Sequence, residues 1–125
     1  MSELYSKRLI EVFTHPKNVG KLKNADAVGT YQSPVCGDML TIYLKIKDNK
    51  IIDASFETFG CMVSVAISSV VTEWAKNKTL EQASKITKKD IIKAIGEIPP
   101  VKEHCLEMSI QALKNAIQNF RKKRI

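Results

Sequence analysis

Two segments in the first half of the chain alternate between apolar and polar residues. The alternation covers 40–47 and, after a polar turn at 48–50, returns over 52–57. This two-residue period predicts half-buried strands joined in an antiparallel hairpin. A shorter strand around 30–33 would complete a three-stranded sheet. The preceding segment, 17–30, has no clear period and is predicted to be a loop.

The period changes to that of a helix on both sides of this sheet. Before it, a short amphipathic helix is predicted over 3–14, with one face made of Tyr5, Leu9, Val12 and Phe13. After Gly60 a longer apolar helix is predicted. The stripe that would cover the sheet consists of Val63, Ala66, Ile67, Val70 and Trp74.

Three further helices are predicted in the second half. Capping boxes at Thr79 and Thr87 predict short helices over about 80–85 and 88–95. The prolines that follow force an extended break. The last helix is predicted from about 103 to 122, with an inward face of Leu106, Ile110, Leu113, Ile117 and Phe120.

Strands followed by helices indicate an α+β fold, with a small antiparallel three-stranded sheet packed against helices. A length of 125 residues fits a single domain covering 1–125. No run of apolar residues approaches the roughly 18 needed to span a membrane. The first residues carry no apolar signal core, so we expect a cytoplasmic protein or a mature form that is already cleaved.

The net charge of +7 is concentrated in the second half of the chain. Residues 1–60 contain eight Lys and Arg against seven Asp and Glu, whereas 61–125 contain twelve against six. The simplest interpretation is a solvated helix end, with cations at the negative end of the helix dipole. An acidic protein partner is the next interpretation. Nucleic acid ranks last, because the sequence has no basic patch rich in aromatic residues.

Three cysteines lie at predicted boundaries between elements: Cys36 before a strand, and Cys61 and Cys105 at helix starts. An odd number excludes complete internal disulfide pairing. In a reducing compartment such cysteines are better interpreted as metal ligands or reactive groups. Three thiolates with one weaker ligand, Asp38 or His104, would hold a soft metal or an iron–sulfur cluster.

The residues around the cysteines are of the kind that stabilise a thiolate. Helix N-termini favour negative charge at Cys61 and Cys105, and Lys102 adds a positive field. Asp38 is two residues from Cys36, so both side chains point to one side of an extended chain. We therefore expect folding to gather the three sulfurs, which are 25 and 44 positions apart, at one end of the molecule.

The cysteines are part of a longer series of motifs through which the chain resembles the iron–sulfur cluster assembly scaffolds of the IscU and NifU N-terminal type. The resemblance covers about 5–120. Its motifs, in order, are HPKNVG at 15–20, CGD at 36–38, TFGC at 58–61, SS and VTEW within 68–74, and PPVKEHC at 99–105. The zinc-binding SufU branch is less similar, because it carries an insertion after the second cysteine that this chain lacks.

The resemblance implies a function and a set of partners. Such scaffolds accept sulfur as a persulfide from a cysteine desulfurase, receive iron, build a labile [2Fe–2S] cluster and pass it to apo-proteins. For this chain we expect a scaffold without turnover chemistry of its own, because His15 and His104 have no clear serine or cysteine partner arranged as a triad, apart from Cys105 itself. Bacterial members also meet an Hsp70-type chaperone with its cochaperone, and neither a membrane nor a nucleic acid is an expected partner.

The resemblance also implies roles for single residues. Cys36, Cys61 and Cys105 match the ligand and sulfur-accepting cysteines. Asp38 matches the carboxylate tied to cluster lability, and His104 the alternative ligand. We favour Cys105 as the persulfide acceptor, on the expectation of an exposed thiolate with a lowered pKa.

Further positions match contacts with partners. Tyr5 matches a tyrosine linked to the pairing of scaffold monomers in a homodimer, and Lys102 a lysine at the edge of the site. The segment that the chaperone would recognise is Ile98, Pro99, Pro100, Val101 and Lys102.

This chain departs from the family pattern beside the second cysteine. Met62, Val63 and Ile67 replace small or hydroxyl residues, which predicts a drier wall and dimerisation over the cluster. The main alternative function keeps the fold and is a zinc-binding sulfur acceptor of the SufU kind. Zinc would take the three cysteines with Asp38 or His104 in a tetrahedral site, and it could occupy the apo form of a scaffold in the same way.

Overall fold

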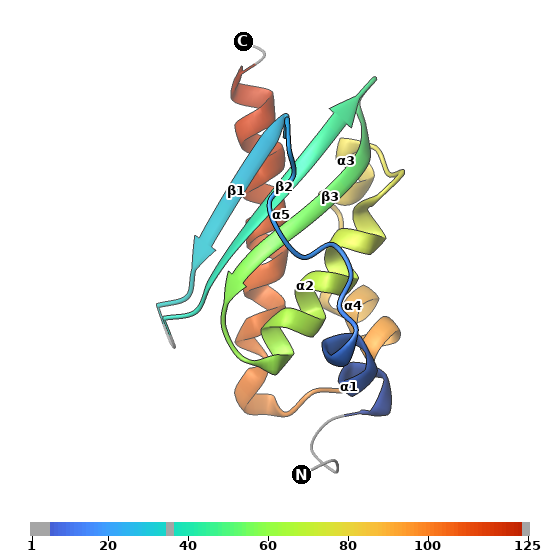
Figure 1. The fold of residues 1–125 in the computed structure, drawn as a ribbon, viewed down its shortest axis with the longest axis vertical. Coiled ribbons are helices and arrows are strands. Elements are labelled where there is room, and N and C mark those ends of the chain that lie inside the picture. The colour runs from blue at the N-terminus through green and yellow to red at the C-terminus, as the bar shows by residue number, and fades with distance from the viewer. Residues whose placement is uncertain (1–5, 35–36, 124–125) are drawn as a thin grey trace.

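The computed structural model describes residues 6–34 and 37–123. Figure 1 shows one sheet with helices packed on one of its faces. The elements in chain order are α1 (Lys7–Thr14), β1 (Ala27–Gln32), β2 (Met39–Lys47), β3 (Lys50–Phe59), α2 (Met62–Ala75), α3 (Leu80–Ala83), α4 (Lys88–Ile95), the short 3-10 turn η1 (Pro100–Lys102) and α5 (His104–Lys123). This arrangement confirms the predicted α+β fold with a three-stranded antiparallel sheet.

β2 is the central strand of the sheet, between β1 and β3. Leu40, Ile42 and Leu44 on β2 are fully buried, whereas the residues between them are only partly buried, which confirms the predicted alternation. The register pairs Ile42 with Gly29 on β1 and with Phe56 on β3. The buried side of the sheet therefore extends across all three strands and packs against α2 and α5.

β1 begins at Ala27, so the strand predicted around 30–33 starts earlier and the predicted loop over 17–30 is wrong at its end. The cause is a close contact between β1 and α5. A Cβ atom added to Gly29 would lie 2.5 Å from the carbonyl oxygen of Ala112 on α5. Strand and helix thus touch backbone to backbone, a contact that a local apolar period does not reveal.

Two connecting segments cover the outer edge of β3. The Gly20 N–H donates to the Phe56 carbonyl at 2.7 Å, and the Phe56 N–H donates to the Asn18 carbonyl at 2.8 Å. Further along, the Asn77 N–H donates to the Ile51 carbonyl at 2.7 Å. These bonds satisfy the strand edge, and the first pair ties the chain after α1 to the sheet.

The two short helices begin where predicted. Thr79 and Thr87 both form complete capping boxes and start α3 and α4. On α1, Leu9 is buried but Phe13 is 39% exposed, so the predicted shared face is wrong at Phe13. Tyr5 lies outside the described residues.

The two long helices provide much of the core. On α2, Val63, Ala66 and Ile67 are fully buried. Val70 and Trp74 are only partly buried and line a groove beside α1 instead of covering the sheet. The predicted stripe is therefore correct for the first part of α2 only.

The last helix begins at His104, after η1. Pro99 is extended, with φ −59° and ψ 142°, while Pro100 already starts η1, so the predicted extended break is shorter than expected. The predicted inward face of α5 is confirmed, with four buried residues and one that is partly buried: Leu106, Ile110, Leu113, Ile117 and Phe120.

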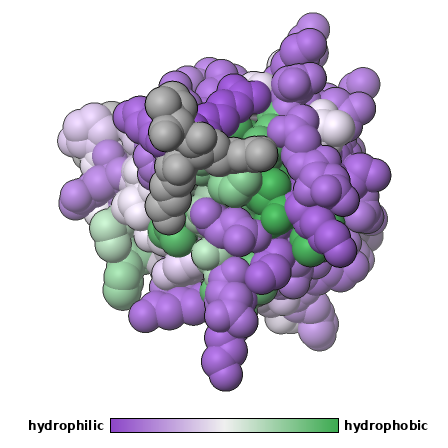
Figure 2. All heavy atoms as spheres, turned by 90° about the horizontal axis from the view of Figure 1, so that it is seen from above, coloured by the Kyte–Doolittle hydropathy of each residue, from purple (hydrophilic) through white to green (hydrophobic). Residues whose placement is uncertain are grey.

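Figure 2 shows the end of the molecule where α5 finishes. Most of this surface is hydrophilic, and hydrophobic side chains occupy a smaller area within it. Among the described residues, the structure contains no helix that is both long and apolar enough to cross a membrane.

Candidate metal centre

Three element boundaries meet at the lower end of the molecule in Figure 1. β2 begins at Met39, which pairs with Phe59 at the end of β3. Asp38, just before β2, therefore lies beside Cys61, which follows β3 and is the N-cap of α2. α5 begins at the same end and brings Cys105 in its first turn.

A carboxylate oxygen of Asp38 and the sulfur atoms of Cys61 and Cys105 lie within 4.8 Å of one another. Asp38 and Cys61 are partly buried, and Cys105 is fully buried. This mixture of soft sulfur and hard oxygen donors suits zinc or the iron of an iron–sulfur cluster. The structure thus brings together two of the three cysteines and Asp38. Cys36 lies outside the described residues.

Ser64, in the first turn of α2, contacts all three of these groups. Its hydroxyl oxygen is 3.2 Å from Asp38 Oδ2, 3.5 Å from Cys105 Sγ and 3.7 Å from Cys61 Sγ. Ser64 is buried, and its single proton can be donated to only one acceptor at a time. Sequence analysis missed this residue. The signal was its position three residues after Cys61, the N-cap to N3 spacing at which two side chains meet at the start of a helix.

A hydrogen bond between the two cysteines separates their pKa values. It lowers the pKa of Cys61 to about 4, helped by hydrogen bonds from Ser64 and from the backbone at the start of α2, while burial opposes this. The same bond raises the pKa of Cys105, and burial raises it further. In the metal-free protein Cys61 is therefore the thiolate, and Cys105 is the thiol that donates to it.

This geometry corrects the expectation for Cys105. We predicted an exposed thiolate whose pKa Lys102 would lower, but Cys105 is 0% exposed and its pKa is raised. Negative charge on Cys61 and the loss of water around Cys105 outweigh the helix N-terminus. The predicted helix-start position of Cys61, by contrast, is confirmed together with its low pKa.

His104 and Lys102 lie at the edge of this group. His104 Nε2 is 3.8 Å from Cys105 Sγ, but it does not join the set of atoms that lie within 4.8 Å of one another. Lys102 ends η1 and is partly buried. Within the described residues, the Asp38 carboxylate therefore lies close to both sulfur atoms, whereas the His104 ring lies close to the Cys105 sulfur alone.

α2 presents a buried wall beside the second cysteine, but one polar side chain lies within it. Val63 and Ile67 are part of the hydrophobic core, and Met62 is partly buried against it. The α2 side chain that contacts the two sulfurs and the carboxylate is the polar Ser64. In the segment predicted for a chaperone, Ile98 is partly buried.

Comparison with known proteins shows which proteins this chain is similar to. The family model described as "NifU-like N terminal domain" matches residues 4–125. The iron-sulfur cluster assembly scaffold protein IscU 1 of Archaeoglobus fulgidus is 48% identical over 120 residues, which are 96% of this chain and 78% of that protein. The iron-sulfur cluster assembly scaffold protein IscU of Escherichia coli K12 is 41% identical, and the match covers 96% of each protein.

A solved structure shares the fold. The N-terminal part of a NifU-like protein from Brucella abortus superposes with a TM-score of 0.77 at 23% identity, covering 98% of this chain and 97% of that one. An identity this low supports a common fold and no more. The family model and the two scaffold relatives lead to one conclusion: this chain belongs to the family of NifU-like N-terminal domains.

Proposed function

We propose that this protein is a scaffold on which a labile [2Fe–2S] cluster is assembled and from which the cluster is passed to apo-proteins. The observation that supports this most is the convergence of Asp38, Cys61 and Cys105 within 4.8 Å at the junction of three elements. The cluster is the cargo of such a protein, so a ligand set that is not entirely thiolate suits its release.

The proposed ligand set contains residues of two kinds. Cys61 and Cys105 supply two sulfurs on the helix starts, and Cys36 is proposed as the third on the basis of the sequence alone. Asp38 is proposed as the weaker ligand, with His104 as its alternative, because the Asp38 carboxylate already lies beside both sulfurs. Ser64 would have to exchange its present hydrogen bonds when iron enters.

Sulfur delivery calls for a thiolate that attacks the outer sulfur of a desulfurase persulfide. In that step the sulfur–sulfur bond of the persulfide breaks, a new one forms on the acceptor, and the desulfurase cysteine leaves as a thiolate. We propose Cys105 as the acceptor. Because its sulfur is buried, this assignment requires η1 and the start of α5 to move and expose it. Cys61 is the alternative, favoured by its low pKa and partial exposure.

Mass spectrometry after incubation with desulfurase and cysteine distinguishes these two acceptors. A persulfide on the peptide that contains Cys105 supports our assignment. A persulfide on Cys61 or Cys36 alone contradicts the assignment and leaves the scaffold function intact.

The partners and location follow the same proposal. We infer a cysteine desulfurase as sulfur donor, apo-proteins as recipients, and an Hsp70-type chaperone with its cochaperone at 98–102. We also infer pairing of two copies through Tyr5, and a cytoplasmic site of action. A protein of this kind carries the cluster and does not turn over a substrate of its own.

The role of Asp38 provides the sharpest test of release. A carboxylate holds cluster iron more weakly than a thiolate does, so Asp38→Ala is expected to make the bound cluster live longer in air and move more slowly to an apo-ferredoxin. Glu81→Ala, which removes an exposed carboxylate on α3, is the matched control. Equal transfer rates for Asp38→Ala and the unchanged protein would remove this role.

The zinc-binding sulfur acceptor is the second candidate. The same oxygen and two sulfurs would serve zinc in a tetrahedral site, so the donor set alone does not choose between the metals. Colour separates them, because zinc sites do not absorb visible light and iron–sulfur clusters do.

A further inference from the structure

A groove of about 680 Å³ lies between α1, α2 and α4, and it shares no residue with the metal centre. Its apolar surface comes from four side chains that are all partly buried: Val12, Val70, Trp74 and Ala94. The proposed scaffold chemistry does not use this groove. Apolar surface left at the meeting point of three helices is the kind of surface that a partner covers.

The groove has the form of a seat for a helix. On α1 its wall includes Arg8 and Val12, which are four residues apart, and His15, the C-cap of α1, continues the wall. On α2 the facing wall includes Val70 and Trp74, again four residues apart. Rows of side chains with this spacing form the ridges between which another helix packs.

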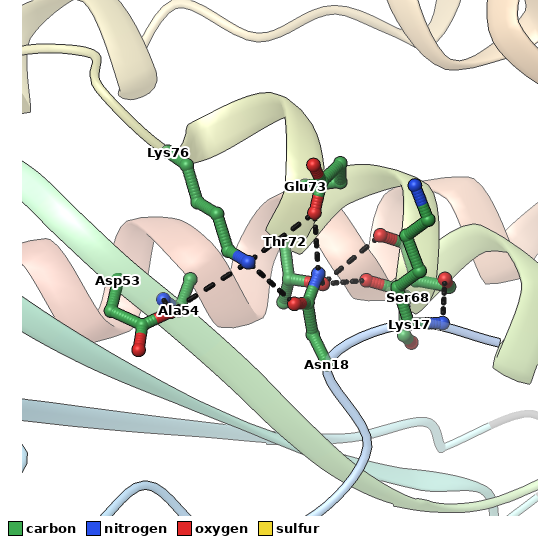
Figure 3. Close-up of polar contacts among 9 residues, drawn as sticks. Lys17, Asn18, Asp53, Ala54, Ser68, Thr72, Glu73 and Lys76 are labelled. Atoms are coloured by element: carbon green, nitrogen blue, oxygen red, sulfur yellow. Dashed lines mark hydrogen bonds and ion pairs between the residues drawn. The ribbon is translucent and has the colours of Figure 1, made fainter.

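Hydrogen bonds fix the walls of the groove before any partner arrives. The Lys17 N–H donates to the Ser69 hydroxyl at 2.8 Å. The Asn18 side-chain amide donates to the Thr72 hydroxyl at 3.1 Å, as Figure 3 shows. At the other end of α1, the Ser6 hydroxyl donates to the carbonyl of Ile95, the last residue of α4. A preformed groove loses little conformational entropy on binding.

The charges at the rim select the partner. Glu73 is already engaged, because it accepts from Asn18 at 3.2 Å and pairs with Lys76 at 3.3 Å (Figure 3). Within residues 6–34 and 37–123, the side chains of Arg8 and Lys17 make no ion pair within 4.0 Å, although the charge of Lys17 helps to lower the pKa of Glu73, and Glu11 is the remaining carboxylate at the rim. Because Glu73 is also held by Lys76, the rim keeps an excess of positive charge beside the apolar surface, which favours an occupant with acidic side chains.

We propose that this groove docks one amphipathic helix of a partner protein, with apolar side chains against Val70 and Trp74 and acidic side chains toward Arg8 and Lys17. Such a docked helix would hold the partner on the protein while the metal centre stays open. This interaction goes beyond the proposed scaffold function and does not depend on it.

Trp74, the only tryptophan of the sequence, reports on this groove directly. The probe is a synthetic helical peptide of about 14 residues, roughly four turns, with leucines on one face and glutamates beside them. A matched peptide carries lysine at every glutamate position. The acidic peptide is expected to change Trp74 fluorescence saturably, and the lysine peptide is expected to bind about tenfold more weakly.

Charge reversal of the protein completes the test. Arg8→Glu with Lys17→Glu is expected to weaken the acidic peptide about tenfold and to strengthen the lysine peptide. Lys23→Glu with Lys47→Glu, which changes two exposed lysines outside the groove by the same charge, is expected to leave both affinities unchanged. All of these variants change exposed side chains, so folding is preserved.

Four results would overturn the proposal. The first two are the absence of a saturable change in Trp74 fluorescence and equal binding of both peptides. The third is binding of dodecanoate without binding of the acidic peptide. The fourth is a Trp74 signal that depends on protein concentration without peptide, which indicates that a second copy of this chain occupies the groove. Cluster assembly can be measured separately on the Arg8 and Lys17 variant. Its retention there would show that the groove and the scaffold function are independent.

Discussion

The Asp38 carboxylate accepts a hydrogen bond of 3.2 Å from the hydroxyl of Ser64, a residue 26 positions further along the chain. The bond joins the start of β2 to the first turn of α2. Because the same hydroxyl also lies 3.5 Å from the Cys105 sulfur, Ser64 connects the hard and the soft donors of the candidate metal centre. Ser64 therefore influences the pKa values of both cysteines in the metal-free site.

Replacing Ser64 by alanine is expected to raise the pKa of Cys61 from its value of about 4. The hydroxyl and the backbone of Ser64 both stabilise the Cys61 thiolate, and alanine keeps only the backbone contribution. The pH dependence of iodoacetamide labelling at Cys61, read by peptide mass spectrometry, measures this pKa. Ser68→Ala is the matched control, since the Ser68 hydroxyl is buried and has no hydrogen-bond partner among the residues that the structure describes. An unchanged Cys61 midpoint in Ser64→Ala would show that the contact has no electrostatic role.

The two described cysteines are expected to react at different pH. Cys61, with a pKa near 4, is mostly a thiolate at pH 6 and should be alkylated there almost as fast as at pH 8. Cys105 has a raised pKa, so it stays a protonated thiol throughout this range and should remain unlabelled. Labelling of the metal-free protein across pH 5 to 9, about the range in which thiols of ordinary and lowered pKa differ, checks this order.

A substitution at Cys61 tests whether the two sulfurs are coupled. The hydrogen bond with Cys61 is the largest cause of the raised pKa of Cys105. In Cys61→Ser the labelling midpoint of Cys105 should therefore fall, although burial still slows the reaction. Should Cys105 label first in the unchanged protein, the assignment of thiolate and thiol would be reversed.

Local patterns predicted most of the fold. The alternation of β2 and the capping boxes at Thr79 and Thr87 depend on neighbouring residues, so the sequence contains their full signal. The start of β1 was missed because it depends on the contact of Gly29 with α5, which is more than eighty residues away in sequence. Val70 and Trp74 were assigned to the sheet because a helical period does not say which neighbour a face will meet.

The sequence predicted which residues form the candidate site, but it did not predict which of its sulfurs is charged. Asp38, Cys61 and Cys105 all lie next to element ends, and that position is visible in the sequence. Neither the burial of Cys105 nor the place of Ser64 among the ligating groups follows from spacing. Both depend on how α2 and α5 pack against each other, and this packing decides which sulfur is charged.

Asn18 is expected to contribute more to stability than a loop residue usually does. Its side-chain amide nitrogen donates to Thr72 and Glu73, and its side-chain oxygen Oδ1 accepts from Lys76 at 2.7 Å (Figure 3). Asn18→Ala should lower the free energy of unfolding by about 2–3 kcal/mol, through lost charge-assisted hydrogen bonds and an unfavourable left-handed backbone at φ 68°. Urea unfolding followed by Trp74 fluorescence measures the loss.

Asn24→Ala separates the two contributions. Asn24 has a similar φ of 62° and is exposed, so its replacement carries the backbone cost of about 1 kcal/mol without the loss of the side-chain network. Equal losses for the two variants would mean that the Asn18 network contributes nothing.

The central claim is that folding assembles Asp38, Cys61 and Cys105 into a site that holds an iron–sulfur cluster. Anaerobic reconstitution with iron, cysteine, a cysteine desulfurase and dithiothreitol, which reduces the persulfide sulfur to sulfide, tests it most directly, by visible absorption together with iron and sulfide analysis. We expect sulfide-to-iron absorption bands with equal amounts of iron and sulfide, and loss of both in Cys61→Ser and Cys105→Ser. A colourless protein that retains only zinc, or a coloured cluster that survives both substitutions, would contradict it.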